Sequence, residues 1–113
     1  MTLNEYQALA QRTHIANNPS AKIENGCLGL AGECGECCDI LKKYLFQGHE
    51  FDRDRVVEEL GDVLWYCAEL ASGLGVSLET VAQRNIDKLR KRYPDGFDPE
   101  RSVNRAEYEV IEK

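Results

Sequence analysis

The absence of proline between Ser20 and Tyr93 is the feature that most limits the fold of this chain. Proline breaks helix interiors because it lacks an N–H and clashes with the preceding turn, so helices can run through this interval without interruption. Apolar residues recur there at steps of three and four, and no stretch alternates apolar and polar residues as a half-buried strand does. The sequence therefore predicts an all-α protein.

Caps and turns divide the chain into four helical segments. Short connections between four helices favour an antiparallel four-helix bundle. The apolar stripes are wide, and Trp65 and Tyr66 lie outside the main stripe of the third segment, so we expect the helix faces to pack against a second copy in a homodimer or a dimer of dimers. The expected boundaries are a capping box at residues 2–5, an end of the first helix at residues 17–20, a turn at residues 47–49, a cap at Asp52 or Asp54, a stop at residues 73–75, a cap at Ser77 and a stop at residues 94–96.

One domain is expected over residues 1–97, followed by a highly charged C-terminal tail over residues 98–113. Asp98 and Pro99 are typical of the start of a short helix, which we expect to fray.

Net charge and composition exclude several classes of protein. Fourteen Lys and Arg stand against twenty Asp and Glu, which gives a formal net charge of −6. An acidic chain repels polyphosphate backbones, so a nucleic acid polymer is not an expected partner. No apolar run approaches the roughly 20 residues that span a bilayer, and no membrane contact is expected. Five cysteines, an odd number without a secretory signal pattern, favour free thiols in the cytoplasm.

Two pairs of carboxylates carry the strongest functional signal. Glu33 and Glu36 stand three positions apart, as do Glu59 and Asp62, so each pair lies on one helical face with Cβ atoms about 5–6 Å apart. Like charges at this spacing repel, and a divalent cation such as Mg²⁺ turns that repulsion into attraction. The two pairs are equidistant from the turn at Gln47, so an antiparallel hairpin places them at the same height. We therefore predict a metal site at these four residues, although solvated acids on exposed helices are the simpler alternative.

A stripe of opposite charge follows on the fourth segment. Asn85, Lys88 and Arg92 recur at steps of three and four, and Lys42 and Lys43 follow Glu36 on the second segment. Taken alone, such a stripe is an ordinary solvated face. Facing a metal site, it would bind the phosphates of a ligand that the metal also holds.

These residues together resemble the MazG-like nucleotide pyrophosphohydrolases, a branch of the all-α NTP pyrophosphatases. The likeness covers roughly residues 28–97 and rests on the E-x-x-E and E-x-x-D motifs, the Gln-Gly-His turn at 47–49, the stretch 58–66 and the segment 85–97. The resemblance implies hydrolysis of an NTP or dNTP to the monophosphate and pyrophosphate, and a housecleaning role against non-standard nucleotides or deoxynucleotides is one expectation that follows. It makes Glu33, Glu36, Glu59 and Asp62 the ligands of Mg²⁺, for which Mn²⁺ could substitute. A carboxylate that the metal does not saturate could activate the water, and we select Glu36 for this role. Asn85, Lys88 and Arg92 are the residues expected to bind phosphate.

Two other functions stay open at this point. One is the related phosphoribosyl-ATP pyrophosphohydrolase reaction, against which the Gln-Gly-His turn and the segment 85–97 argue. The other is a non-catalytic dimer that binds a metal or a nucleotide.

Glycines and cysteines of the second segment have structural explanations. Glycine costs about 1 kcal/mol against alanine inside a helix, so glycines at 26, 29, 32 and 35 predict close helix contact or room for a ligand beside Glu33 and Glu36. Cys34 and Cys37 form a C-x-x-C motif without the preceding strand that redox motifs have, and we expect structural thiols.

Overall fold

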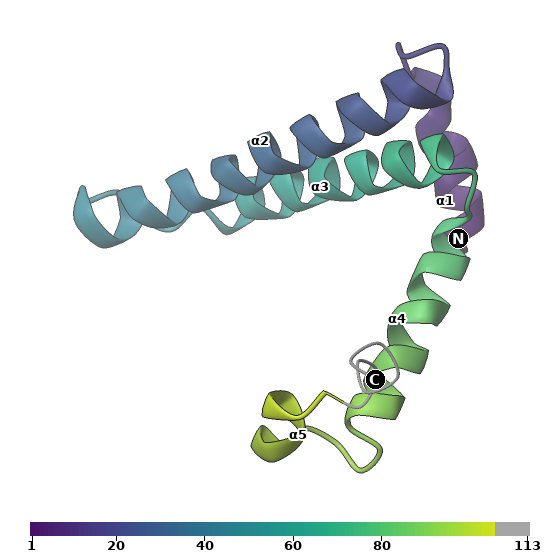
Figure 1. Cartoon of the computed structure of the whole chain (residues 1–113). Helices are drawn as coiled ribbons and strands as arrows, with labels where there is room; N and C mark the ends of the chain where they lie inside the picture. The colour runs from purple at the N-terminus through teal and green to yellow at the C-terminus, as the bar shows by residue number, and fades with distance from the viewer. Residues whose placement is uncertain (106–113) are drawn as a thin grey trace. The chain divides into compact units, whose positions relative to one another are not determined.

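The computed structural model describes residues 1–105, which contain helices and no β-strand (Figure 1). The all-α prediction is confirmed. None of the helices in this part of the chain is long and apolar enough to cross a membrane. The predicted tail begins with a short helix, and its residues 106–113 lie outside the described part. The elements are α1 (Leu3–Ala10), the 3-10 turn η1 (Gln11–Thr13), α2 (Pro19–Phe46), α3 (Arg53–Gly73), α4 (Leu78–Arg92) and α5 (Pro99–Val103).

The chain forms two compact units that divide after Leu78. The first unit contains α1, η1, α2 and α3, and the second contains α4 beyond its first residue and α5. The packing of four helices into one bundle stays a prediction.

Polar side chains cap α1, α2 and α3. The side-chain oxygens of Thr2, Asn18 and Asp52 each accept a hydrogen bond from the backbone N–H three residues later, at 3.0, 2.9 and 3.1 Å. The N-caps at Thr2 and Asp52 are confirmed. The expectation that residues 17–20 end the first helix is wrong. α1 ends at Ala10, η1 follows it, and Asn18 instead caps α2 with Pro19 at its first position.

An antiparallel hairpin of α2 and α3 dominates the first unit, and its two helices lie side by side (Figure 1). The connection spans residues 47–52, at the predicted turn, where Gly48 has a φ of +73°. Glycine takes this left-handed conformation without the steric cost of a Cβ.

Glycine permits the close contact between these two helices. A Cβ at Gly26 would lie 2.7 Å from the Cβ of Leu70, and one at Gly73 would lie 2.9 Å from the backbone nitrogen of Ile23. Such distances are too short for a real side chain, so the helix backbones approach here because both positions lack one. The prediction of close contact is confirmed for Gly26.

The other glycines of α2 differ in their surroundings. A Cβ at Gly29 would overlap the ring of Tyr66, whereas Gly32 and Gly35 face open space. The first two glycines of this series therefore permit contact with α3, and the last two leave open space on the part of α2 that carries Glu33 and Glu36.

The buried core lies where α1 packs against the C-terminal half of α3. Three of its four buried side chains are alanines, which allow α1 and α3 to approach closely. Gln7 of α1 also closes the end of α3, because its Nε2 donates to Ser72 Oγ at 3.0 Å and its Oε1 accepts from the Leu78 N–H at 2.7 Å. The core consists of Ala10, Ala68, Ala71 and Leu78, with Tyr6, Trp65, Cys67 and Val76 packed against it.

A fully buried carboxylate joins η1, α2 and α3. Glu69 is 0% exposed, and its two oxygens accept hydrogen bonds from Gln11 Nε2 at 3.2 Å and Asn25 Nδ2 at 2.9 Å. Lys22 Nζ in turn donates to Gln11 Oε1 at 2.6 Å. Buried carboxylates are costly unless they are hydrogen-bonded, so this network fixes which residues of the three segments meet.

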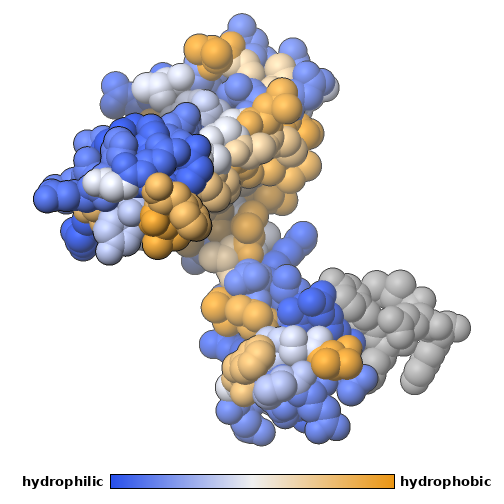
Figure 2. Space-filling model, turned by 90° about the vertical axis from the view of Figure 1, so that its left-hand side faces the viewer, coloured by the Kyte–Doolittle hydropathy of each residue, from blue (hydrophilic) through white to orange (hydrophobic). Residues whose placement is uncertain are grey.

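The apolar stripes noted in the sequence lie largely at the surface of this chain. Leu60 is 60% exposed, and Val57, Leu64, Leu41 and Leu45 are also exposed. Figure 2 shows apolar side chains beside hydrophilic ones on the surface. The hairpin instead buries the faces that carry Gly26, Ile40 and Glu69.

The second unit contains α4, a turn and α5. The predicted stop after α4 is confirmed, since Gly96 has a φ of +97° and its N–H donates to Tyr93 O at 3.3 Å. The rings of Tyr93 and Phe97 pack at a centroid distance of 5.2 Å. Asp98 caps α5, as its Oδ1 accepts from the Glu100 N–H at 3.0 Å.

Substitution of two glycines on α2 should have opposite effects on stability. Gly26→Ala should lower the free energy of unfolding by about 1–3 kcal/mol, because the new methyl group overlaps Leu70. Gly32→Ala should raise it by about 1 kcal/mol, because it gains helix propensity in open space. Urea unfolding followed by circular dichroism measures both changes. Equal effects of the two substitutions would contradict the close contact at Gly26.

Candidate metal centre and nucleotide pocket

Three carboxylates converge between α2 and α3. Glu33 comes from α2 and Glu59 and Asp62 from α3, and each offers an oxygen such that the three atoms lie within 4.8 Å of one another. Glu33 and Glu59 are half-buried, and Asp62 is exposed. Carboxylate oxygens are the ligands that hard divalent cations prefer, so this set fits Mg²⁺ or Mn²⁺. The equal spacing of the two pairs from the turn predicts this meeting.

Mutual repulsion changes the protonation of this cluster. The pKa of Glu33 is raised from 4.5 to about 7, first because its carboxyl hydrogen-bonds Glu59, then by partial desolvation and by the negative charges of Asp62, Glu59 and Glu36. Carboxylates that crowd together share a proton when no cation is near. A divalent cation would take the place of that proton.

Glu36 lies outside the group of three. It is exposed on α2, but it is close enough for its charge to raise the pKa of Glu33. Its two expected roles, as a metal ligand and as the carboxylate that activates water, stay predictions.

Two aromatic side chains complete a pocket beside the carboxylates. Glu33, Asp62, Trp65 and Tyr66 line a cavity of about 360 Å³. The rings of Trp65 and Tyr66 meet edge to face, with centroids 5.0 Å apart and planes at 84°. The two residues lie outside the main apolar stripe because they line this cavity, where they form an apolar wall next to the carboxylates.

Helix α1 also borders this region. Burial raises the pKa of the Tyr6 phenol, and the negative charge of Asp62 raises it further. Nothing in the spacing of the first segment indicates this contact, because it depends on how α1 lies against α3.

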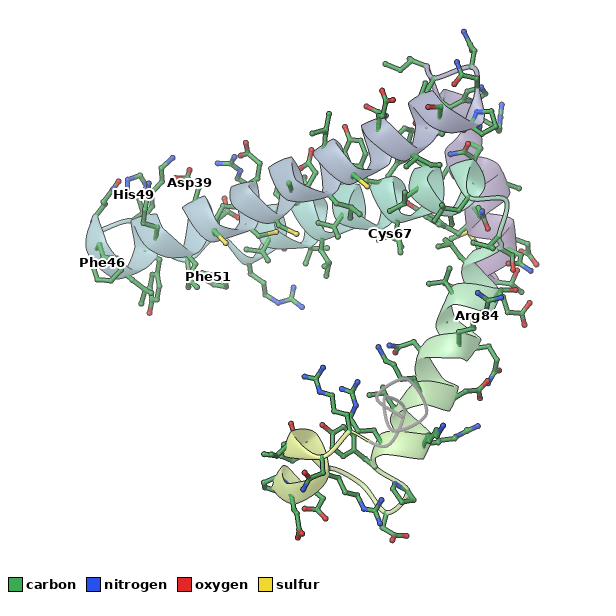
Figure 3. The ribbon with its side chains drawn as sticks, viewed as in Figure 1. Asp39, Phe46, His49, Phe51, Cys67 and Arg84 are labelled. Carbon is green, nitrogen blue, oxygen red and sulfur yellow. The ribbon has the colours of Figure 1, made fainter. Side chains whose placement is uncertain are left out.

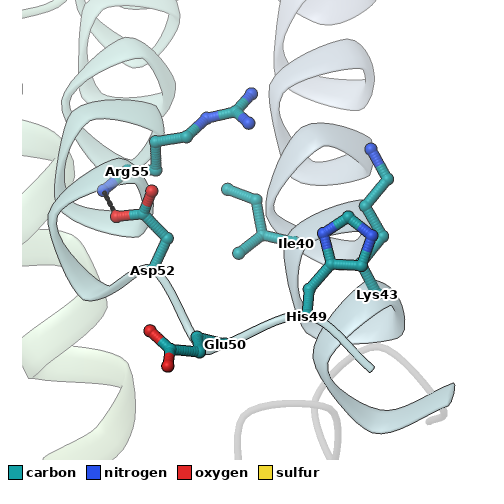
Figure 4. A pocket seen from close by; sticks show the side chains of 6 residues that line it. All are labelled: Ile40, Lys43, His49, Glu50, Asp52 and Arg55. Atoms are coloured by element: carbon teal, nitrogen blue, oxygen red, sulfur yellow. Dashed lines mark hydrogen bonds between the residues drawn. The ribbon is translucent and has the colours of Figure 1, made fainter. Parts of the chain in front are cut away.

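A second cavity of about 180 Å³ lies at the tip of the hairpin (Figure 4). Figure 3 places His49 there, near Phe46 and Phe51. The cationic ends of Lys43 and Arg55 extend to the same side of the loop, whereas Glu50 points away from them (Figure 4). The cavity is lined by Ile40, Lys43, His49, Glu50, Asp52 and Arg55.

Arg55 is the residue of this cavity that the sequence analysis missed. It lies four positions before Glu59 and therefore about one helical turn from the carboxylate cluster on α3. Lys43 pairs with Asp39 at 2.9 Å, whereas no carboxylate of the described residues forms an ion pair with Arg55. Its spacing from Glu59 could have identified it, because residues four apart share a helix face.

Cys37 lies close enough to the carboxylates for their charge to affect its thiol. Burial raises the pKa of Cys37, and the negative charge of Glu59 raises it further. A thiol whose pKa is raised stays protonated and is a poor nucleophile, which supports a structural role for the C-x-x-C motif.

The predicted phosphate-binding residues lie in the second unit. Asn85, Lys88 and Arg92 are on α4, where Asn85 and Lys88 are exposed and Arg92 lies over the ring of Tyr93 at 5.8 Å from its centroid. Their role in binding phosphate stays a prediction.

Comparison with known proteins identifies the family. The model of the MazG nucleotide pyrophosphohydrolase domain matches residues 22–97, which is more than half of the chain. The chain belongs to the MazG family. All four candidate metal ligands lie in the matched region, and α1 and η1 precede it.

One curated protein is similar to this chain over part of its length. The chain is 45% identical over 73 residues to "Gene 37 protein" of Mycobacterium phage L5, across 61% of this chain and 64% of the phage protein. The match therefore spans less than two thirds of the length of the phage protein. No solved structure matches the chain significantly.

Removal of the Glu33 charge should change how stability depends on pH. Because the folded-state pKa of Glu33 is raised, this residue stabilises the folded state fully below about pH 4.5, and the stabilisation is lost as the pH rises through about 7. Without divalent ions, the urea midpoint of the wild type should therefore fall relative to that of Glu33→Gln across this range. Above pH 7, Mg²⁺ should raise the midpoint of the wild type more than that of the variant. Parallel pH curves and equal responses to Mg²⁺ would count against the cluster.

Proposed function

We propose that the protein hydrolyses a nucleoside triphosphate to the nucleoside monophosphate and pyrophosphate. The observation that carries this proposal is the convergence of Glu33, Glu59 and Asp62 beside an aromatic pocket, in a chain of the MazG family. A chain with a net charge of −6 repels a triphosphate unless cations neutralise it. Divalent cations held by the carboxylates would remove this electrostatic repulsion at the site itself.

The carboxylate cluster would hold Mg²⁺, with Mn²⁺ as a substitute. Bound there, the ion would neutralise phosphate oxygens and lower the pKa of an attacking water. Glu33 and Glu59 are half-buried and share a proton without metal, so they are suited to remain ligands. Glu36, outside the cluster and exposed, is free to accept the proton of the water as a general base.

Basic residues would bind the phosphates that the metal leaves exposed. Arg55 and Lys43 extend from the tip cavity on the same two helices that carry the carboxylates. They are suited to the terminal phosphates, which leave as pyrophosphate. Asn85, Lys88 and Arg92 of α4 are the further candidates, and their charges would offset the charge that develops in the transition state.

Pyrophosphate release from a panel of NTPs and dNTPs, with Mg²⁺ and with EDTA, tests the proposal. Glu36→Gln should lower kcat by at least about 100-fold, the usual contribution of a general base. Glu33→Gln should raise the Mg²⁺ concentration required for half-maximal rate. Glu58→Gln is the matched control, because Glu58 is an exposed neighbour about 100° around α3 from Glu59.

Two results would contradict the enzyme. Metal-independent release of pyrophosphate would exclude the carboxylate mechanism. Binding of Mg²⁺ and nucleotides without any product would favour the non-catalytic binding protein.

We also propose that the protein self-associates through the α3 apolar face, which consists of Val57, Leu60, Val63, Leu64 and Cys67. These residues line a shallow depression of about 350 Å³ that is almost entirely apolar. Apolar patches of this kind on small proteins usually bind a partner. The face runs along the same turns of α3 as Glu59 and Asp62, so a second copy would border the metal centre.

A charge placed on this face should dissociate the assembly. Val57→Lys combined with Leu64→Lys should shift the protein from dimer or tetramer to monomer at micromolar concentration, as measured by sedimentation. Glu58→Lys, which adds the same charge beside the face, should leave the assembly intact. A wild type that sediments as a monomer would contradict self-association.

A further inference from the structure

We infer that Trp65 is the platform on which the base of the nucleotide stacks and that η1 positions its indole, an inference that rests on the nucleotide function proposed above. Trp65 shares one cavity with Glu33 and Asp62. A ligand that fills this cavity contacts both carboxylates and aromatic rings. A nucleotide matches both groups, since its phosphates bind cations and its base is a flat aromatic ring.

The indole is held in place by its own N–H. Trp65 Nε1 donates to the backbone oxygen of Ala10 and to Thr13 Oγ1, each at 3.0 Å. Thr13 Oγ1 itself donates to Ala10 O at 3.1 Å, which closes the set of three groups. Because this N–H is already bonded within the protein, Trp65 can offer a ligand its ring face but no hydrogen bond.

Hydrogen bonds to a buried carboxylate hold η1, the turn whose Thr13 bonds Trp65. Gln11 of η1 donates to the fully buried Glu69, and Asn25 of α2 holds the other oxygen of that carboxylate. The position of η1 is therefore set by the core of the first unit. η1 precedes the region that matches the MazG family, so the family comparison assigns it no role.

Tyr66 forms the adjoining wall of the cavity, and the absence of a side chain at Gly29 makes room for its ring. Its ring occupies the space that a side chain at Gly29 would fill. The edge-to-face contact with Tyr66 then leaves the faces of the two rings at a steep angle, 84°. One flat base can stack on one of these rings and touch the edge of the other.

Recognition by a ring face has a consequence for the substrate. Stacking on an aromatic side chain tolerates every base, because each base has a π-face. Trp65 should therefore contribute similar affinity to nucleotides of all four common bases. Any preference among bases must come from groups other than the Trp65 N–H.

The fluorescence of Trp65 provides the first test, since it is the single tryptophan of the chain. Four α,β-imido nucleoside triphosphates, one for each common base, serve as probes with Mg²⁺, and calorimetry measures their binding in parallel. Each should change the Trp65 emission. Inorganic tripolyphosphate, which has no base, should bind with a much smaller change.

Kinetics of three variants provide the second test. Trp65→Leu should raise KM for all four substrates by roughly 5- to 100-fold, the range that loss of one stacked base implies, with kcat little changed. Thr13→Val removes the hydroxyl at nearly constant volume and should raise KM and shift the free-protein emission of Trp65. Thr13→Ser keeps the hydroxyl and should restore both values. Thermal unfolding of each variant confirms that it is folded.

The outcomes separate this inference from the proposed function. Calorimetric binding without a change in Trp65 emission, or an unchanged KM in Trp65→Leu, overturns the stacking and leaves the pyrophosphohydrolase standing. Equal defects in Thr13→Ser and Thr13→Val overturn the role of the hydroxyl in positioning. Failure of the wild type to bind or hydrolyse any of the nucleotides overturns both proposals.

Discussion

Close contact between α2 and α3 is the constraint on which the rest of the first unit depends. Gly26 and Gly73 let the two backbones approach, because a Cβ at either position would overlap the opposite helix. This contact fixes the rotation of each helix about its axis. Once the rotation is fixed, Glu33 must face Glu59, and Asn25 must face Glu69. The metal centre and the hydrogen-bond network of Glu69 thus both result from this one interface. On α2, Gly29 separates Asn25 of the network from Glu33 of the metal centre.

Without a cation, the carboxylate cluster loses its stabilising contribution as the pH rises through about 7. Repulsion and a shared hydrogen bond raise the pKa of Glu33 to about 7, so the folded protein holds a proton at a position where an isolated glutamate would not. A purely structural helix pair gains nothing from this arrangement. A MazG-family chain that binds a metal triphosphate gains neutralisation of its substrate at the point of reaction.

Helix α1 and η1 connect the folded core to the candidate pocket. The buried carboxylate of Glu69 holds Gln11, and the next turn of chain holds the indole of Trp65 through Thr13. Small core residues such as Ala10 and Ala68 make this close packing possible. The indole of Trp65 is therefore fixed to the core through hydrogen bonds, which suits a residue that presents a flat face to a ligand.

Local features of the sequence determined the helices, the hairpin turn and the pairing of the two acidic motifs. Helix periodicity, caps such as Thr2 and Asp52 and the glycine at the turn act over a few residues, so they can be read without knowledge of distant contacts. Only the tertiary structure decided that Glu36 lies outside the three-carboxylate group and that Glu69 is buried. It also decided that Trp65 bonds to residues of η1 more than 50 positions earlier. These outcomes depend on how packed helices are rotated and how closely they approach. Both are determined jointly by side chains that lie far apart in the sequence, so no local pattern encodes them.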